Sequence, residues 1–162
     1  MKKIRRAQPT DAKGIHEAHM RSIREICAKD HSTEEINAWG YRPFREDHRL
    51  NAIANQFVWV VDSDGSVEGY GHLGLETKDY KSVAHIHGLY LAPEAIGLGL
   101  GHKIVTAMIN EAKEKGAKEI VLESTLTAHK FYQRVGFKDI GPQMKVSIGG
   151  VDIRCIPMSM QL

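Results

Sequence analysis

Residues 93–103 read PEAIGLGLGHK and place glycine at alternate positions 97, 99 and 101. Apolar and β-branched residues precede this stretch at 83–91, and apolar residues recur at helical spacing from 104 to 112. That order predicts a strand, a glycine turn and a helix. Backbone N–H groups at a helix start bind anions, and glycines let a ligand approach them closely. The stretch therefore predicts a site for a pyrophosphate group.

Two other kinds of glycine loop fit this stretch poorly. A P-loop needs Gly-Lys followed by Ser or Thr, but here His102 precedes Lys103 and Ile104 follows it. A Rossmann fingerprint would need a further glycine where His102 or Ile104 stands, near the start of an alternating β-α series that this chain lacks. A plain tight turn remains the alternative, although each glycine at a helix start costs about 0.5–1 kcal/mol.

A second informative stretch, residues 123–137, reads ESTLTAHKFYQRVGF. It contains Ala128, the aromatic pair Phe131 and Tyr132, and then Gly136 followed by Phe137. Together the two stretches resemble motif A and a second signature of the GNAT N-acetyltransferase superfamily, at the separation expected there. The resemblance covers residues 83–137 well, the 57–75 region loosely, and the first helices in type and order only.

The length fits one domain, and the resemblance implies a single N-acetyltransferase domain over residues 1–162. We expect strands at 2–7, 57–61, 67–75, 83–91, 119–123, from 137, 145–148 and 151–156, and helices at 10–29, from 32, within 41–55, at 104–116 and at 127–135. Thr10 or Asp11 should cap the first helix, and residues 77–82 should connect two strands. The fold class is α/β in the mixed sense, or α+β by stricter accounting. The GNAT resemblance implies a mostly antiparallel twisted sheet, flanked by helices, with one parallel pair splayed to hold acetyl-CoA.

The resemblance implies that acetyl-CoA is the cosubstrate and lies between the strands at 83–91 and 119–123. We expect no metal. The residues expected to contact it are Leu89, Tyr90, Leu91, Gly97, Leu98, Gly99, Leu100, Gly101, His102, Lys103, Thr127 and Phe131. The superfamily usually has Arg or Gln where Ile96 stands, and Lys103 offers a compensating charge. Tyr132 matches the tyrosine that donates a proton to the departing thiolate; the alternative is a core aromatic residue.

An amine acceptor also needs a base, because an alkylammonium with a pKa of about 10.4 is almost fully protonated at neutral pH. His85 and His87 lie two residues apart on one strand and should share a face, together with Leu89 and Leu91. We favour His87 as the base, with His85 beside it. His72, Glu76 and Glu123 are further candidates. Both histidines could instead be ordinary strand residues, and no third metal ligand is evident from the sequence.

Two functions therefore stay open. The first is an N-acetyltransferase that acts on a primary amine of an unidentified small molecule or peptide. The second is a catalytically silent domain that binds acyl-CoA as a sensor or scaffold, and replacing Tyr132 by Phe would leave that function intact. The acceptor pocket should come from the N-terminal helices and the C-terminal hairpin, where polar and aromatic candidates are His16, His19, Arg24, Trp39, Tyr41 and Arg42.

Composition sets broader limits on the function. The net charge of +2, from 22 basic and 20 acidic residues without blocks of like charge, gives no case for nucleic acid. No apolar stretch is long enough to span a membrane, and no signal peptide is evident at the N-terminus. Cys27 and Cys155 have no metal-ligand or disulfide-scaffold spacing, so we expect two buried thiols and a cytoplasmic location. The apolar C-terminal residues 156–160 would suit a homodimer, as the resemblance allows.

Overall fold

The computed structural model describes residues 1–78 and 81–162. Its helices and strands follow one another as β1 (Lys2–Arg6), α1 (Ala12–Glu25), α2 (Thr33–Trp39), α3 (Glu46–Asn55), β2 (Phe57–Ser63), β3 (Ser66–Lys78), β4 (Lys81–Leu91), α4 (Leu100–Glu114), β5 (Glu119–Ser124), α5 (His129–Val135), β6 (Lys138–Asp139), β7 (Met144–Ile148) and β8 (Val151–Gln161). Short 3-10 turns at Pro9–Asp11, Cys27–Lys29 and Pro93–Ala95 lie between them. None of the helices in this described part has both the length and the apolar character needed to cross a bilayer.

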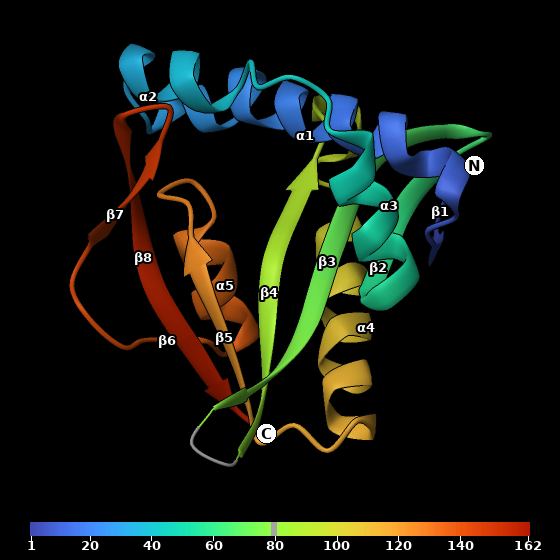
Figure 1. Ribbon diagram of the computed structural model, residues 1–162, viewed down its shortest axis with the longest axis vertical. Coiled ribbons are helices and arrows are strands. Elements are labelled where there is room, and N and C mark those ends of the chain that lie inside the picture. The colour runs from blue at the N-terminus through green and yellow to red at the C-terminus, as the bar shows by residue number, and fades with distance from the viewer. Residues whose placement is uncertain (79–80) are drawn as a thin grey trace.

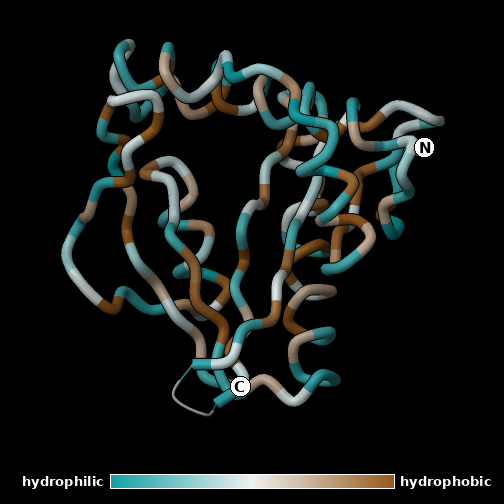
Figure 2. The backbone as a smooth tube through the Cα atoms, in the orientation of Figure 1, coloured by the Kyte–Doolittle hydropathy of each residue, from teal (hydrophilic) through white to brown (hydrophobic). Residues whose placement is uncertain are grey.

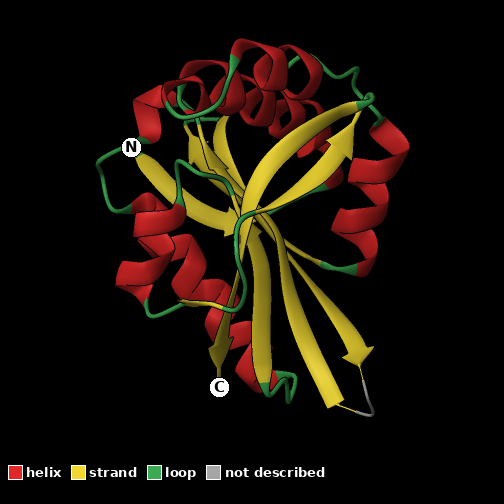
Figure 3. Ribbon diagram, turned by 90° about the vertical axis from the view of Figure 1, so that its left-hand side faces the viewer, coloured by secondary structure: helices red, strands yellow, loops and turns green. Residues whose placement is uncertain are grey.

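The described strands form an eight-stranded sheet in the order β1-β2-β3-β4-β5-β8-β6, with β7 paired to β8. All described pairings are antiparallel except that of β4 with β5. In Figure 1, α1 and α2 run across the upper ends of the central strands, whereas α4 and α5 lie behind the sheet. Figure 3 shows the strong twist of the sheet from the side. The mixed fold class, with one parallel pair in a mostly antiparallel sheet, is therefore confirmed.

The parallel pair is joined over only part of its length. Residues 83–86 of β4 pair with residues 119–122 of β5, and β4 then continues to Leu91 with β3 as its neighbour. β5 pairs with β8 along its whole length, so its last residues, Glu123 and Ser124, pair with β8 alone. Beyond Ile86 the two strands therefore separate, and the backbone of β4 has a free edge on the side facing β5.

A β-bulge at His87 changes which side chains of β4 face which way. Ile86 pairs with Leu73 and Gly88 pairs with His72, so His87 has no partner on β3. One extra residue shifts the alternation of a strand. The expectation that Leu89 and Leu91 share a face with the strand histidines is therefore wrong. After the bulge these leucines pack against the same apolar core as Ile86.

Three apolar cores pack against the sheet in the described part of the chain, and the smallest lies around Ile15, Val58, Val60 and Tyr70. Residues Ile104, Val105 and Met108 of α4 are fully buried against strands and α5 in the larger core. A smaller core joins α1 and α2 to β8, through residues that include Trp39 and Ile153. Figure 2 shows hydrophobic residues along β5. The free thiols of Cys27 and Cys155 are both buried, as expected.

Some element boundaries differ from the sequence expectations. The connection expected at 77–82 is too long, because β3 extends to Lys78 and β4 begins at Lys81; residues 79–80 of it lie outside the described residues. The first helix ends at Glu25, before a short 3-10 turn, and the strand expected from 137 is only two residues long. Asp11 stands at the N-cap of α1 without a capping bond. Its carboxylate accepts hydrogen bonds from Arg5 Nη1 and Nη2 (2.8 and 3.0 Å) and the Gln8 N–H (2.7 Å) instead.

A buried carboxylate, Glu35, ties α2 to β8 and to the segment after β5. It accepts hydrogen bonds from Nη2 and the backbone N–H of Arg154 (2.6 and 2.9 Å) and from the N–H of Ser32 (2.9 Å). His31 Nδ1 lies 3.0 Å from the same carboxylate, and His31 Nε2 accepts from the N–H of Leu126 (3.2 Å). Burial alone would raise the pKa of Glu35, but these donors hold it well below its ordinary value of 4.5.

We expect Glu35→Gln to lower the free energy of unfolding at pH 7 by about 1–3 kcal/mol, because it leaves charged and backbone donors without a carboxylate. A carboxyl group whose pKa is lower in the folded than in the unfolded state stabilises the fold at pH values above the unfolded-state pKa. This stabilisation is lost as the pH falls toward the folded-state pKa. The difference from the wild type should therefore shrink below about pH 4. Urea denaturation from pH 7 to pH 3 measures this, with Glu34→Gln on the exposed side of the same helix as the control. An equal loss in both variants would contradict the assignment.

Candidate active site

The glycine turn forms the start of α4 in a conformation that requires glycine. Gly97 and Gly99 have φ values of 78° and 76°, in the left-handed region, and Gly99 is the N-cap of α4. A Cβ added at either would meet no atom within 4 Å, so the backbone angles, not crowding, favour glycine there. The N–H of Lys103 bonds to Gly99, and the earlier N–H groups of the first turn have no partner within the helix. They are the donors that an anion would use.

The side chains of the turn divide between core and solvent. Leu100 is buried in the larger core, so only its backbone can serve a ligand. His102 and Lys103 are exposed, and so are Gly97 and Leu98. Gly101 and Ile96 both line the cavity described next. The turn therefore offers a ligand its backbone N–H groups and one exposed lysine. At position 96 the apolar Ile96 adds no side-chain donor or positive charge.

A cavity of about 270 Å³ occupies the gap where β4 and β5 separate; we call it the interstrand cavity. Residues of four neighbouring segments line it, among them Cys27, Leu89, Tyr90, Leu91, Gly101, Thr127, Ala128, Phe131 and Tyr132. Thr127 Oγ1 is buried there and has no hydrogen-bond partner among the described residues. Six of the twelve residues expected to contact acetyl-CoA, namely Leu89, Tyr90, Leu91, Gly101, Thr127 and Phe131, thus lie around one cavity, and the other six continue from it along the glycine turn.

Tyr132 combines the packing of a core residue with access to this cavity. Only 5% of it is exposed, and its ring makes edge contacts with Phe131 and Phe137 at centroid distances of 5.3 and 5.6 Å. Burial raises the pKa of its hydroxyl above the ordinary value of 10. The phenol therefore keeps its proton at neutral pH and can act only as a donor of it.

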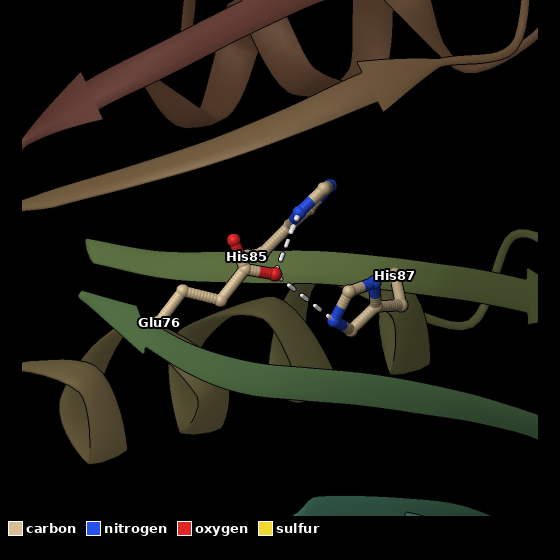
Figure 4. A group of neighbouring side chains, drawn as sticks. All are labelled: Glu76, His85 and His87. Carbon is tan, nitrogen blue, oxygen red and sulfur yellow. Dashed lines mark ion pairs between the residues drawn. The ribbon is translucent and has the colours of Figure 1, made fainter. Parts of the chain in front are cut away.

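Five titratable side chains on β3, β4 and β5 gather beside the cavity. His85 Nε2 donates to Glu123 (2.7 Å), and its Nδ1 lies 3.5 Å from a Glu76 oxygen. The same Glu76 oxygen is 3.9 Å from His87 Nε2. Figure 4 shows this carboxylate pointing between the two imidazoles. The His87 ring lies 4.4 Å from that of His85 and 4.8 Å from that of His72, so all five candidate bases from the sequence are neighbours.

The surroundings drive the pKa values of the three histidines apart. The hydrogen bond to Glu123 raises the pKa of His85, and burial partly opposes this. Burial and the charge of His85 lower the pKa of His87. Burial, with His87 next to it, lowers the pKa of His72 to about 4. His87 is therefore neutral at pH 7, and its side chain is 32% exposed, so it can accept a proton from a molecule beside it.

A third metal ligand beside His85 and His87, not evident from the sequence, is present in Glu76. One ligand atom from each of these three residues lies within 4.8 Å of the others. The residue types would suit zinc. However, both ring nitrogens of His85 face carboxylates, which favours a protonated imidazole at this position over a neutral metal ligand.

A second cavity of about 320 Å³ lies between the sheet, α1, α2 and the β7–β8 hairpin; we call it the hairpin cavity. Its lining includes His19, Trp39, Arg42, Val146, Ile148, Ile153, Arg154 and Cys155. Of the N-terminal candidates, His19, Trp39 and Arg42 line it and the other three do not. The ring of His16 lies beside that of Phe44 in a tilted arrangement, and Arg24 lies over the exposed ring of Tyr41. The sequence predicted that the C-terminal hairpin contributes to the acceptor pocket, but it did not identify which residues of the hairpin line it.

The two cavities meet at His87 and Glu123. Both residues line the interstrand cavity and the hairpin cavity, as do Ile86, Tyr90 and Thr125. Tyr132 lines only the interstrand cavity. A proton acceptor thus stands at the junction, and a proton donor stands within one of the two compartments.

Two known proteins that this chain resembles in sequence are N-acetyltransferases. The family model described as acetyltransferase (GNAT) domain matches residues 27–162. The chain is 31% identical over 124 residues to the uncharacterized N-acetyltransferase YjgM of Escherichia coli, covering 74% of each chain. It is 28% identical over 126 residues to the glucosamine 6-phosphate N-acetyltransferase of Candida albicans, covering 76% of this chain and 78% of that one.

Solved structures show the same fold. A GCN5-related N-acetyltransferase from Rhodopseudomonas palustris matches with a TM-score of 0.84 at 23% identity, covering 99% of this chain and 95% of that one. An acetyltransferase from Salmonella typhimurium, solved with acetyl-CoA, matches with a TM-score of 0.73 at 23% identity, covering 100% and 94%.

We expect His85 to titrate above the ordinary histidine value of about 6.5 and His87 to titrate below it. Replacing Glu123 by Gln should lower the pKa of His85, because the charged acceptor of its strongest hydrogen bond is lost. Imidazole resonances followed by NMR over pH 4–9 measure both values. Glu119→Gln, on the same strand, is the control. An unchanged His85 titration in Glu123→Gln would show that the pair does not form in solution.

Proposed function

The chain belongs to the GNAT acetyltransferase family, and we propose that it transfers the acetyl group of acetyl-CoA to a primary amine. In this proposal the interstrand cavity takes the acetylated thiol arm, and the hairpin cavity takes the amine. The observation that carries it is the junction of the two cavities at His87, with Tyr132 on the thiol side.

Several unsatisfied groups support the binding of the thioester donor. The free edge of β4 beyond Ile86 offers backbone groups to an extended amide-containing arm, as an added strand would. Thr127 Oγ1 is a buried hydroxyl without a partner among the described residues. The first N–H groups of α4, after Gly99, suit a pyrophosphate. In space, these groups extend from the junction of the cavities to the glycine turn. That arrangement suits a ligand with an acyl group at one end and a phosphate group at the other.

The acid and base roles follow from the protonation states. His87, neutral at pH 7, accepts the proton that the ammonium must lose before its nitrogen can form a C–N bond with the acetyl carbon. Tyr132, protonated throughout the neutral range, donates a proton to the sulfur as the C–S bond breaks. Proton exchange with water then restores both side chains. His85 serves as a positioning residue, since its bond to Glu123 fixes the ring against which His87 stacks.

The acceptor class can be identified by a direct assay. The Candida albicans relative is named for an amino sugar phosphate, but at 28% identity this does not transfer to the present chain. A panel of amino acids, amino sugars, polyamines, aminoglycosides and peptides, assayed by release of free thiol from acetyl-CoA, would identify the acceptor class.

We expect Tyr132→Phe to lower kcat by about 10²-fold or more with that acceptor, because the leaving sulfur loses its proton donor. Coenzyme A binding, measured by calorimetry, should stay within about threefold of the wild type, because the ring packing is retained. Tyr41→Phe, at a 63% exposed tyrosine that lines neither cavity, is the control. Tight coenzyme A binding without turnover by the wild type on the whole panel would favour a silent acyl-CoA sensor.

The pH profile should identify His87 as the base. For the wild type we expect kcat/KM to fall on the acid side with a midpoint below 6.5, because burial and His85 lower the pKa of His87. In His87→Gln, kcat/KM should no longer level off above that midpoint. It should instead keep rising with pH, as the fraction of neutral amine rises. His48→Gln, an exposed histidine on α3, is the control.

Dialysis against EDTA should leave the activity unchanged. Activity that is lost to EDTA and restored by Zn²⁺ would assign the histidine cluster to a metal instead.

A further inference from the structure

The hairpin cavity contains a positive charge that the described residues do not neutralise. Arg42 lines it, donates from Nε to the carbonyl of Trp39 (2.9 Å), and pairs with no carboxylate in the described part of the chain. Burial and the nearby cation of Arg49 make this charge costly. The other arginine of the cavity, Arg154, is already held by Glu35. Arg42 is therefore the cavity cation that still lacks an anionic partner.

A buried donor in the same wall also lacks an acceptor. His19 is 8% exposed, and its Nδ1 lies 2.9 Å from Arg49 Nη2, which can only donate. Burial and the neighbouring arginines lower the pKa of His19 well below 6.5, so the ring is neutral. Because Nδ1 accepts from Arg49, the ring proton belongs on Nε2. Nε2 is buried and has no hydrogen-bond partner among residues 1–78 and 81–162. Arg42 and His19 thus offer unused N–H groups from α1 and the segment after α2.

The sheet side of the hairpin cavity has the opposite character. Glu123, His85 and His87 line it from β4 and β5, whereas Arg42 comes from the segment between α2 and α3. In Figure 1, α1 and α2 lie across the upper ends of these strands. Carboxylate and imidazole suit an ammonium group, whereas a guanidinium and an imidazole N–H suit an anion. The cavity therefore has two chemically different ends.

We propose that the acceptor is an amine that also carries an anionic group, a carboxylate or a phosphate, and that Arg42, with His19, binds that group. This inference rests on the proposed function, because it assigns the hairpin cavity to the acceptor. Arg42 forms the charged contact and His19 Nε2 donates to the same anion. The amine then lies toward His87 at the junction of the cavities.

The test compares matched amines with and without the anion: phenylalanine with phenylalaninamide, and glucosamine 6-phosphate with glucosamine. The amines within a pair differ in basicity, so the measure is how the ratio of kcat/KM within a pair changes between wild type and variant. We expect at least one wild-type ratio to favour the anionic member, and Arg42→Gln to lower that ratio by about tenfold or more. Arg42→Lys should retain part of the preference. Arg45→Gln, an exposed arginine on the same loop, should retain all of it.

A binding measurement separates the failure of this inference from that of the proposed function. With coenzyme A saturating, so that the glycine turn is filled, calorimetry with inorganic phosphate and with acetate should show binding that Arg42→Gln weakens about tenfold or more. The better of the two probes identifies the anion. Arg42-dependent binding without any turnover would overturn the acetyl transfer proposal and leave the anion site standing. Turnover that favours the neutral members, or ratios and anion binding unchanged in Arg42→Gln, would overturn the inference.

Discussion

The short parallel pairing of β4 with β5 is the constraint on which the rest of this structure depends. Four residues of each strand are joined, and the strands then part. Continued pairing would satisfy the backbone of β4 but would fill the interstrand cavity. The bulge at His87 lies just beyond the last paired residue, Ile86, and turns the following leucines toward the core. The same point on β4 therefore opens the sheet and places an imidazole at the opening.

Packing on both faces holds the separated strands in place. Behind the sheet, α4 and α5 share one apolar core with β4 and β5. On the other face, Glu35 fixes α2 to Arg154 of β8, and His31 reaches the backbone after β5. A buried carboxylate with several donors is costly to disrupt, because each donor would lose a charged acceptor. The walls of both cavities are thus set by contacts between segments far apart in the chain.

The sequence was sufficient for the parts of the fold with a local signal. The glycine spacing at 97–101, the helix start at Ser32 and the apolar periodicities predicted the elements and the parallel pair. The neighbouring positions of His85 and His87 also followed from alternation along β4, whereas the approach of His72, Glu76 and Glu123 depends on the pairing of three strands. The register between β3 and β4 could not be predicted from the sequence. The bulge at His87 has no signature in the residue types around it, so the face on which Leu89 lies was predicted wrongly. The unneutralised state of Arg42 depends on which carboxylates fold near it, which no local pattern records.

The thiol of Cys27 has a consequence for how a thioester would survive in the interstrand cavity. Cys27 lines that cavity, and burial raises its pKa to about 11. At pH 7 only about one such thiol in 10⁴ is ionised, and the thiolate is the form that attacks an activated acyl group. Burial therefore protects against transthioesterification, in which the protein would acylate itself and retain the group meant for its acceptor. The same apolar lining that forms the cavity thus keeps the Cys27 thiol protonated.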